Sequence, residues 1–233
     1  MLISGLQKMT LLDYPGLVAC TVFTGGCNFR CPFCHNASLV LPEELQAADG
    51  GVEAVLSFLK KRQGLLDGVA VTGGEPLLHA DMADFLREVK TLGYRVKLDT
   101  NGSFPDRLQS LVEEGLVDRV AMDIKNAPAL YARTAGLETM DMAAVARSKD
   151  YLLSGAVEYE FRTTVVRGLH TRESLVESAR WIAGAQAYFL QQFKDSGALI
   201  DGSGLGAFSD DEMRALLTAV REVLPVAELR GVD

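Results

Sequence analysis

Apolar segments of two kinds alternate along this chain, and the alternation restricts its fold more than any other feature. Short runs with the composition of β-strands occupy residues 17–23, 69–72, 94–100, 117–124, 157–166 and 187–193. Between them, apolar residues recur at helical spacing around residues 52–59, 82–89, 105–115, 141–154 and 171–183. Strands that alternate with helices form parallel sheets with right-handed crossovers. The sequence therefore predicts an α/β fold, a partial (β/α)6 barrel of parallel strands.

The size and composition of the chain fit a single globular domain. It has 233 residues, of which 48% are hydrophobic and 23% are charged, as is ordinary for one large core. We expect one domain over residues 1–233, with its core at about 17–193 and a C-terminal loop and helix at 194–233. The capping box Ser209-x-x-Glu212 predicts the start of that last helix.

Charge and hydropathy exclude several classes of partner. The net charge of −8 argues against non-specific binding to nucleic acid. No apolar run approaches the ~18 residues of a membrane-spanning helix, and residues 1–5 lack the features of a signal peptide. Four cysteines without export do not indicate a disulfide framework. We therefore expect a cytoplasmic protein with reduced thiols and no membrane partner.

Three cysteines stand close together, directly after the first predicted strand. Cys27, Cys31 and Cys34 have the spacing Cys-x3-Cys-x2-Cys. Three soft sulfur ligands on one loop hold an iron–sulfur cluster and leave one iron without a protein ligand. A substrate or cofactor can bind at that open iron, so the spacing predicts a site of chemistry.

A tetrahedral zinc site is the alternative for this loop. Its fourth ligand would be His35, which adjoins the last cysteine, or Cys20, which lies inside an apolar strand. Neither suits the geometry, so the spacing favours iron–sulfur. His79 and His170 have no ligand spacing and are expected to be surface or capping residues.

Polar or glycine-rich residues follow each later strand of the predicted sheet. They are Gly73, Gly74 and Glu75 after the second strand, Asp99 and Asn101 after the third, Asp123 and Lys125 after the fourth, Arg162 late in the fifth and Gln191 late in the sixth. Barrel enzymes have their active sites at the carboxyl ends of the strands. Alternation places Lys97 with Asp99, and Asp123 with Lys125, on shared faces, where they either line a polar pocket or form buried ion pairs.

These motifs resemble a known family. The pattern Cys-x3-Cys-x-aromatic-Cys is similar to the signature of the radical S-adenosylmethionine (SAM) enzymes. The wider segments GLQK at 5–8, DYPG at 13–16 and FTGGCNFRCPFCHN at 23–36 resemble the activating proteins of anaerobic ribonucleoside-triphosphate reductases, relatives of the pyruvate formate-lyase activating enzyme. The likeness extends to about Asp201 and implies the radical SAM core, a six-strand partial TIM-like barrel.

The resemblance also implies the cofactors and their residues. It implies one [4Fe-4S] cluster per chain on the three clustered cysteines, with SAM bound beside it. The residues that it implies for SAM are Phe33, Gly73, Gly74, Glu75, Asp99, Asn101, Asp123, Lys125, Arg162 and Gln191. Among them, Phe33 is expected to meet the adenine, and the turn at residues 73–75 to hold the ammonium group of the methionine part.

Two of these assignments stay open at this point. The planar donors of Arg162 suit the methionine carboxylate, but an ion pair with Glu160 suits them equally. Gln191 stands where a related activating enzyme has a histidine, so its role is undecided.

The activity implied by the resemblance is that of a glycyl-radical enzyme activase. One electron from the cluster cleaves SAM to methionine and a 5′-deoxyadenosyl radical, which abstracts hydrogen from a glycine of a partner enzyme. That partner is expected to be anaerobic ribonucleotide reductase, with flavodoxin or ferredoxin as electron donor and no catalytic residue beyond the cluster and cofactor. The alternatives are an activase of another glycyl-radical enzyme, a small-molecule radical SAM enzyme such as a 7-carboxy-7-deazaguanine synthase, and a zinc-stabilised module without catalysis.

Overall fold

The computed structural model describes residues 1–195 and 197–232, and one curved sheet of eight strands forms its centre. Their order in the sheet is their order in the chain: β1 (Ile3–Thr10), β2 (Ala19–Thr24), β3 (Gly68–Gly73), β4 (Arg95–Thr100), β5 (Arg119–Asp123), β6 (Glu158–Val165), β7 (Tyr188–Gln192) and β8 (Ala227–Arg230). β1 is antiparallel to β2, and all other neighbouring strands are parallel. The fold is therefore an α/β partial barrel, as predicted.

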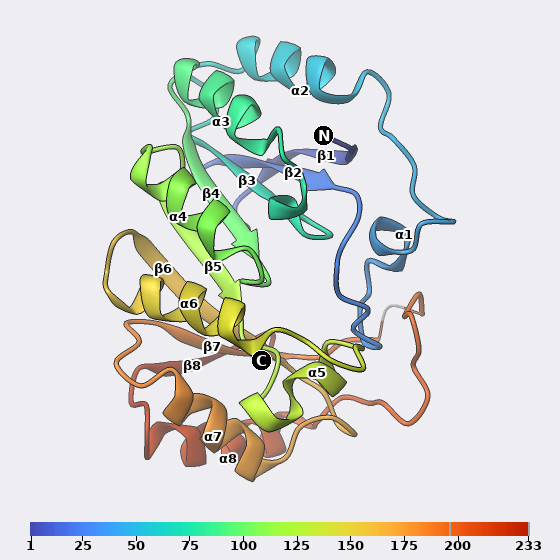
Figure 1. Ribbon diagram of the computed structural model, residues 1–233, viewed down its shortest axis with the longest axis vertical. Coiled ribbons are helices and arrows are strands. Elements are labelled where there is room, and N and C mark those ends of the chain that lie inside the picture. Colours follow the sequence, from blue (N-terminus) through green and yellow to red (C-terminus); the bar gives the residue numbers. More distant parts are fainter. Residues whose placement is uncertain (196, 233) are drawn as a thin grey trace.

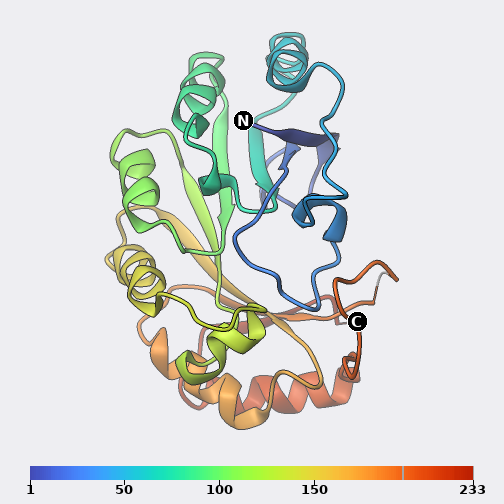
Figure 2. The same ribbon diagram turned by 45° about the vertical axis from the view of Figure 1, so that its right-hand side comes forward.

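The longer helices cover the outer face of the sheet (Figure 1). The helices are α1 (Ala37–Val40), α2 (Gly51–Lys60), α3 (Met82–Thr91), α4 (Pro105–Glu113), α5 (Tyr131–Thr134), α6 (Met142–Leu153), α7 (Arg172–Trp181) and α8 (Asp210–Arg221), with the 3₁₀ turns η1 (Pro76–Leu78) and η2 (Pro128–Leu130). Figure 2 shows the longer ones as an arc around the strands, while the loop after β2 lies on the open side. None of the described helices has the length and apolarity to cross a membrane.

The predicted helices form because each buries one apolar face against the sheet. α3 buries Met82, Phe85, Leu86 and Val89, which stand at helical spacing. α8 starts at the predicted capping box, where the hydroxyl of Ser209 accepts from the backbone N–H of Glu212. The helices therefore begin and end within a few residues of the positions predicted from the sequence.

Two strands were not predicted, and both lie at the edges of the sheet. β1 pairs with β2 although its residues 7–9 are exposed, and β8 has only four residues. β8 pairs with β7, placing Arg230 beside Gln191. Residues 194–233 therefore add a strand to the core as well as the expected loop and helix. Within the predicted loop at 194–206, Ser196 lies outside the described residues.

Candidate active site

A cavity of about 280 Å³ opens at the carboxyl ends of the parallel strands. Every residue predicted for the site lines it except Glu75. The lining consists of Cys27, Phe29, Cys31, Phe33, Cys34, His35, Asn36, Val40, Thr72, Gly73, Gly74, Asp99, Thr100, Asn101, Asp123, Lys125, Arg162, Thr164 and Gln191. The predicted set of cofactor residues did not include the threonines, although Thr164 follows Arg162 by two positions and alternation points it to the same side.

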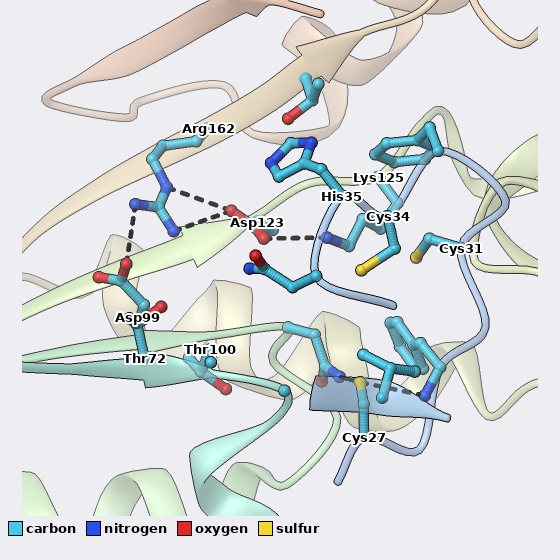
Figure 3. A pocket seen from close by; sticks show the side chains of 18 of the residues that line it. Cys27, Cys31, Cys34, His35, Thr72, Asp99, Thr100, Asp123, Lys125 and Arg162 are labelled. Carbon is cyan, nitrogen blue, oxygen red and sulfur yellow. Dashed lines mark hydrogen bonds and ion pairs between the residues drawn. The ribbon is translucent and has the colours of Figure 1, made fainter. Parts of the chain in front are cut away.

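The three clustered cysteines face this cavity as free thiols. Figure 3 shows the sulfur atoms of Cys31 and Cys34 turned toward each other, with Cys27 on the other side of the pocket. Burial raises the pKa of Cys27 to about 12 and that of Cys31 to about 11. The sulfur of Cys27 also accepts hydrogen bonds from the backbone N–H of Phe29 (3.3 Å) and from Nδ2 of Asn101 (3.9 Å). A metal that binds these thiols displaces their protons.

Hydrogen bonds to its backbone hold the cysteine loop, in addition to the burial of Phe29 and Phe33. Nη1 of Arg30 donates to the carbonyl oxygens of Cys27 (2.6 Å) and Phe29 (2.8 Å). The backbone N–H of Asp201 donates to the carbonyl of Pro32 (3.0 Å), so the loop after β7 touches the cysteine loop. A side chain of the loop itself and one segment that is remote in sequence thus hold the backbone that carries the thiols.

The two glycines after β3 are required by the backbone that passes beside them. A Cβ on Gly73, whose φ is +120°, would lie 2.3 Å from the carbonyl oxygen of Thr24. A Cβ on Gly74 would lie 2.0 Å from the carbonyl oxygen of Gly26. The backbone N–H of Gly74 donates to Thr24 (2.9 Å). The turn therefore packs directly on the start of the cysteine loop, where no side chain fits.

Glu75 is the one predicted site residue that does not reach the cavity. Its carboxylate is fully buried and accepts from the backbone N–H of Leu77 (2.9 Å), the hydroxyl of Thr100 (2.9 Å) and the backbone N–H of Asn101 (2.7 Å). Burial raises its pKa to about 7, although the hydrogen bonds from these donors act to lower it. The carboxylate thus joins η1 to the end of β4 and positions Asn101.

A row of ion pairs crosses the barrel interior beside the cavity (Figure 3). Lys97 pairs with Asp99, and Asp99 accepts from Nη1 of Arg162 (3.1 Å). Arg162 also pairs with Asp123 (3.0 Å), which accepts from Nζ of Lys125 (2.9 Å). Burial would raise the pKa of Asp123, but Lys125 and Arg162 outweigh it and lower the pKa to about 2. The predicted polar interior and both shared faces are therefore present as one network.

Arg162 does not pair with Glu160, which was one of its two predicted partners. Glu160 is fully buried and accepts from Arg119 (2.8 Å) and, through both oxygens, from Arg230 (2.7 and 3.0 Å). Glu160 and Arg162 are two positions apart in β6 and share a face, but the unpredicted strand β8 supplies Arg230, which binds both oxygens of Glu160. Arg162 is left to bridge the two aspartates.

Of the two residues considered as a fourth zinc ligand, His35 lines the cavity with the three cysteines and Cys20 does not. Cys20 is buried inside β2 and does not line the cavity. His170 is buried, contrary to the expectation of a surface residue, and its ring nitrogens contact the backbone of Val166 (3.1 Å) and Lys125 (2.8 Å). Among the described residues, no three His, Cys, Asp or Glu side chains form a group that would hold a single metal ion.

Comparison with known proteins gives one family match and several relatives. The model of the radical SAM superfamily matches residues 21–180. A Methanocaldococcus jannaschii protein whose name places it among the glycyl-radical enzyme activating enzymes is 30% identical over 203 residues, covering 84% of this chain and 82% of that protein. The pyruvate formate-lyase-activating enzyme of Clostridium pasteurianum is 31% identical over 134 residues, or 53% of this chain and 52% of the enzyme.

Two other matches have lower sequence identity, and this chain covers a smaller share of the matched protein than in the first comparison. The GTP 3′,8-cyclase of Marinobacter nauticus is 27% identical over 89% of this chain and 63% of its own length. Among solved structures, Streptococcus suis SuiB bound to SAM superposes with a TM-score of 0.69 at 13% identity, over 89% of this chain. The chain spans 49% of SuiB, so that likeness concerns the fold alone.

Proposed function

Because this chain belongs to the radical SAM superfamily, we propose that it activates a glycyl-radical enzyme. One observation supports the proposal most: the three cysteines and the polar ends of later strands line the same cavity. The most extensive curated likeness described above, to the M. jannaschii protein, covers most of both chains and points to the same activity.

The donor set of the loop fits a [4Fe-4S] cluster. A cluster binds each thiolate at a different iron, so its cysteines need not converge on one point. Cys27, Cys31 and Cys34 would hold three irons, and no fourth cysteine lines the cavity. The hydrogen bonds that Cys27 accepts from Phe29 and Asn101 are of the kind that tunes such clusters.

The rest of the cavity fits SAM, which has an ammonium group, a carboxylate, a ribose and an adenine. We propose that Gly73 and Gly74 present main chain to the ammonium group, and that Lys125 and Arg162 compensate the carboxylate. Phe33 would face the adenine, while Asp99 and Asn101 would lie near the ribose and methionine part. Asp123 and Gln191 complete the lining, and Glu75 would act through Asn101.

The protein residues bind and orient, while the bound groups supply the chemistry. The cluster and SAM, once held by these residues, would supply one-electron cleavage of the sulfonium and a 5′-deoxyadenosyl radical for hydrogen abstraction. Arg162 pairs with both Asp99 and Asp123 and fixes the two carboxylates in place. Arg30 fixes the carbonyls of the cysteine loop. No side chain of the cavity is needed as an acid or base.

Anaerobic ribonucleotide reductase is the partner that we propose, with flavodoxin or ferredoxin as electron donor. The segments flanking the cysteines favour this partner over other glycyl-radical enzymes. The likeness to GTP 3′,8-cyclases makes a small-molecule radical SAM enzyme the second candidate. We also propose that the three cysteines bind an iron–sulfur cluster rather than a zinc ion.

Anaerobic reconstitution tests the proposal. We expect the wild type to bind iron and sulfide and to form 5′-deoxyadenosine from SAM with dithionite. Cys31→Ala should lose both properties, whereas Cys20→Ala, which alters the thiol outside the cavity, should keep them. A colourless protein that holds only zinc after reconstitution would contradict the proposal.

A further inference from the structure

A second cavity, of about 300 Å³, adjoins the first at the carboxyl ends of β6, β7 and β8. His35, Thr164 and Gln191 line both cavities and so form the boundary between them. The residues that line only the second are Gln192, Lys194, Arg230 and Gly231. A molecule in the second cavity would therefore reach the edge of the proposed SAM pocket.

The second cavity is basic in an acidic protein. The net charge of the chain is −8, yet the lining contains Lys194, Arg230 and His35 and no acidic side chain. Arg230 is neutralised by Glu160, which it contacts through two nitrogens. Lys194 makes no ion pair or side-chain hydrogen bond with the described residues. The cavity thus offers one uncompensated cation.

The position of Lys194 is defined by the end of β8. A Cβ on Gly231 would lie 4.0 Å from Cε of Lys194 and 3.9 Å from Cβ of Gln192. The end of the lysine side chain therefore lies near this glycine. Lys194 is exposed and lines the cavity, so its ammonium group is accessible to a bound molecule.

The other polar groups offer both donors and acceptors. The hydroxyl of Thr164 and the amide of Gln191 make no side-chain hydrogen bond within the described part of the chain. The amide nitrogen of Gln192 is engaged by Phe208 (3.0 Å) and Asp210 (2.8 Å), which leaves its oxygen as an acceptor. A mixed set of this kind suits polypeptide main chain, whose N–H and C=O groups alternate and must both be satisfied.

We propose that the second cavity receives the partner's polypeptide next to its target glycine, and that Lys194 determines this binding by holding an oxygen acceptor of that segment. The inference rests on the proposed function. The acceptor is either a main-chain carbonyl or a carboxylate, since an ammonium group binds both. The boundary residues then place the bound segment beside the cofactor.

The test is Lys194→Met, which keeps the length of the side chain and removes the charge. With reconstituted enzyme and anaerobic ribonucleotide reductase, we expect the KM for the reductase in glycyl-radical formation to rise at least tenfold. The affinity for SAM and the formation of 5′-deoxyadenosine without partner should not change. Lys61→Met, on the surface after α2, is the matched control and should leave the KM unchanged.

Ionic strength identifies the acceptor. If Lys194 holds a carboxylate, the wild-type KM will rise with salt, and if it holds carbonyls, the KM will be nearly insensitive to salt. An unchanged KM in Lys194→Met overturns the inference alone. The inference is also overturned if Lys194→Met weakens the affinity for SAM while the KM for the reductase is unaffected. The same holds if the variant weakens the affinity for GTP, used as a probe of a small anionic substrate, with that KM unaffected. If the wild type cleaves SAM but yields no glycyl radical, the proposed function fails and the inference with it.

Discussion

Arg30 donates from Nη1 to the carbonyl oxygen of Cys27 at 2.6 Å, within the loop proposed to hold the cluster. The same nitrogen donates to Phe29 at 2.8 Å. No carboxylate pairs with Arg30 among the described residues, so its positive charge stays uncompensated on this loop.

Arg30 should therefore raise the reduction potential of the cluster. A fixed cation favours the reduced form, which has one more negative charge. We expect Arg30→Gln to lower the midpoint potential by tens of mV, roughly up to the 59 mV of a tenfold one-electron change, while Arg30→Lys preserves most of it. An anaerobic redox titration followed by electron paramagnetic resonance measures this. An unchanged potential at full iron content would rule out the role.

Gly74→Ala should disturb the cysteine loop without touching a cysteine. The new Cβ would lie 2.0 Å from the carbonyl oxygen of Gly26, so the backbone must move. We expect a loss of about 1–3 kcal/mol in the free energy of unfolding and lower iron content after reconstitution. Gly206→Ala is the control, because nothing lies within 4 Å of its added Cβ. Equal stability of the two variants in urea would refute the steric argument.

Arg162→Met should leave two carboxylates facing each other inside the barrel. Asp99 and Asp123 both pair with Arg162, and breaking a buried pair typically costs about 3–5 kcal/mol. We expect a large fall in urea stability and weaker SAM binding. Adding Asp99→Asn should recover part of the stability, with a coupling of about 0.5–3 kcal/mol. Strictly additive effects would mean that the two side chains do not interact.

His170 should make stability depend on pH below neutrality. Burial lowers its pKa from 6.5, and its ring accepts from the backbone N–H of Val166. The unfolded chain takes up a proton below pH 6.5 while the folded one resists, so this contribution is full above 6.5 and is lost as the pH falls. The advantage of wild type over His170→Gln should shrink by up to about 1.4 kcal/mol per pH unit. Urea unfolding at pH 7.5 and 5.5 measures it, and a constant difference would contradict the assignment.

Local patterns were sufficient for most of the barrel. Strands β2 to β7 were predictable because each is a buried apolar run between helices with a clear apolar face. Alternation also predicted that Lys97 and Asp99 share a face, as their ion pair shows. β1 and β8 were missed because edge strands depend on pairing across the sheet more than on their own pattern.

The roles of individual polar residues depended on neighbours that are remote in sequence. Glu75 is turned from the cavity because Thr100 and Asn101, on another strand, supply donors to it. Glu160 pairs with Arg230, which lies on a strand that was not predicted, and Arg162 pairs with the two aspartates instead. Sequence spacing has no information on such partners, so it placed these residues at the site without resolving what they contact.

The most direct test of the account is the transfer of the radical to a glycine. Reconstituted enzyme, SAM, a reductant and anaerobic ribonucleotide reductase are combined without oxygen, and electron paramagnetic resonance is recorded on the reductase. The account predicts a glycyl-radical signal that disappears with Cys31→Ala and when the target glycine is replaced by alanine. Formation of 5′-deoxyadenosine without any glycyl signal, on this reductase or on other glycyl-radical enzymes, would contradict it.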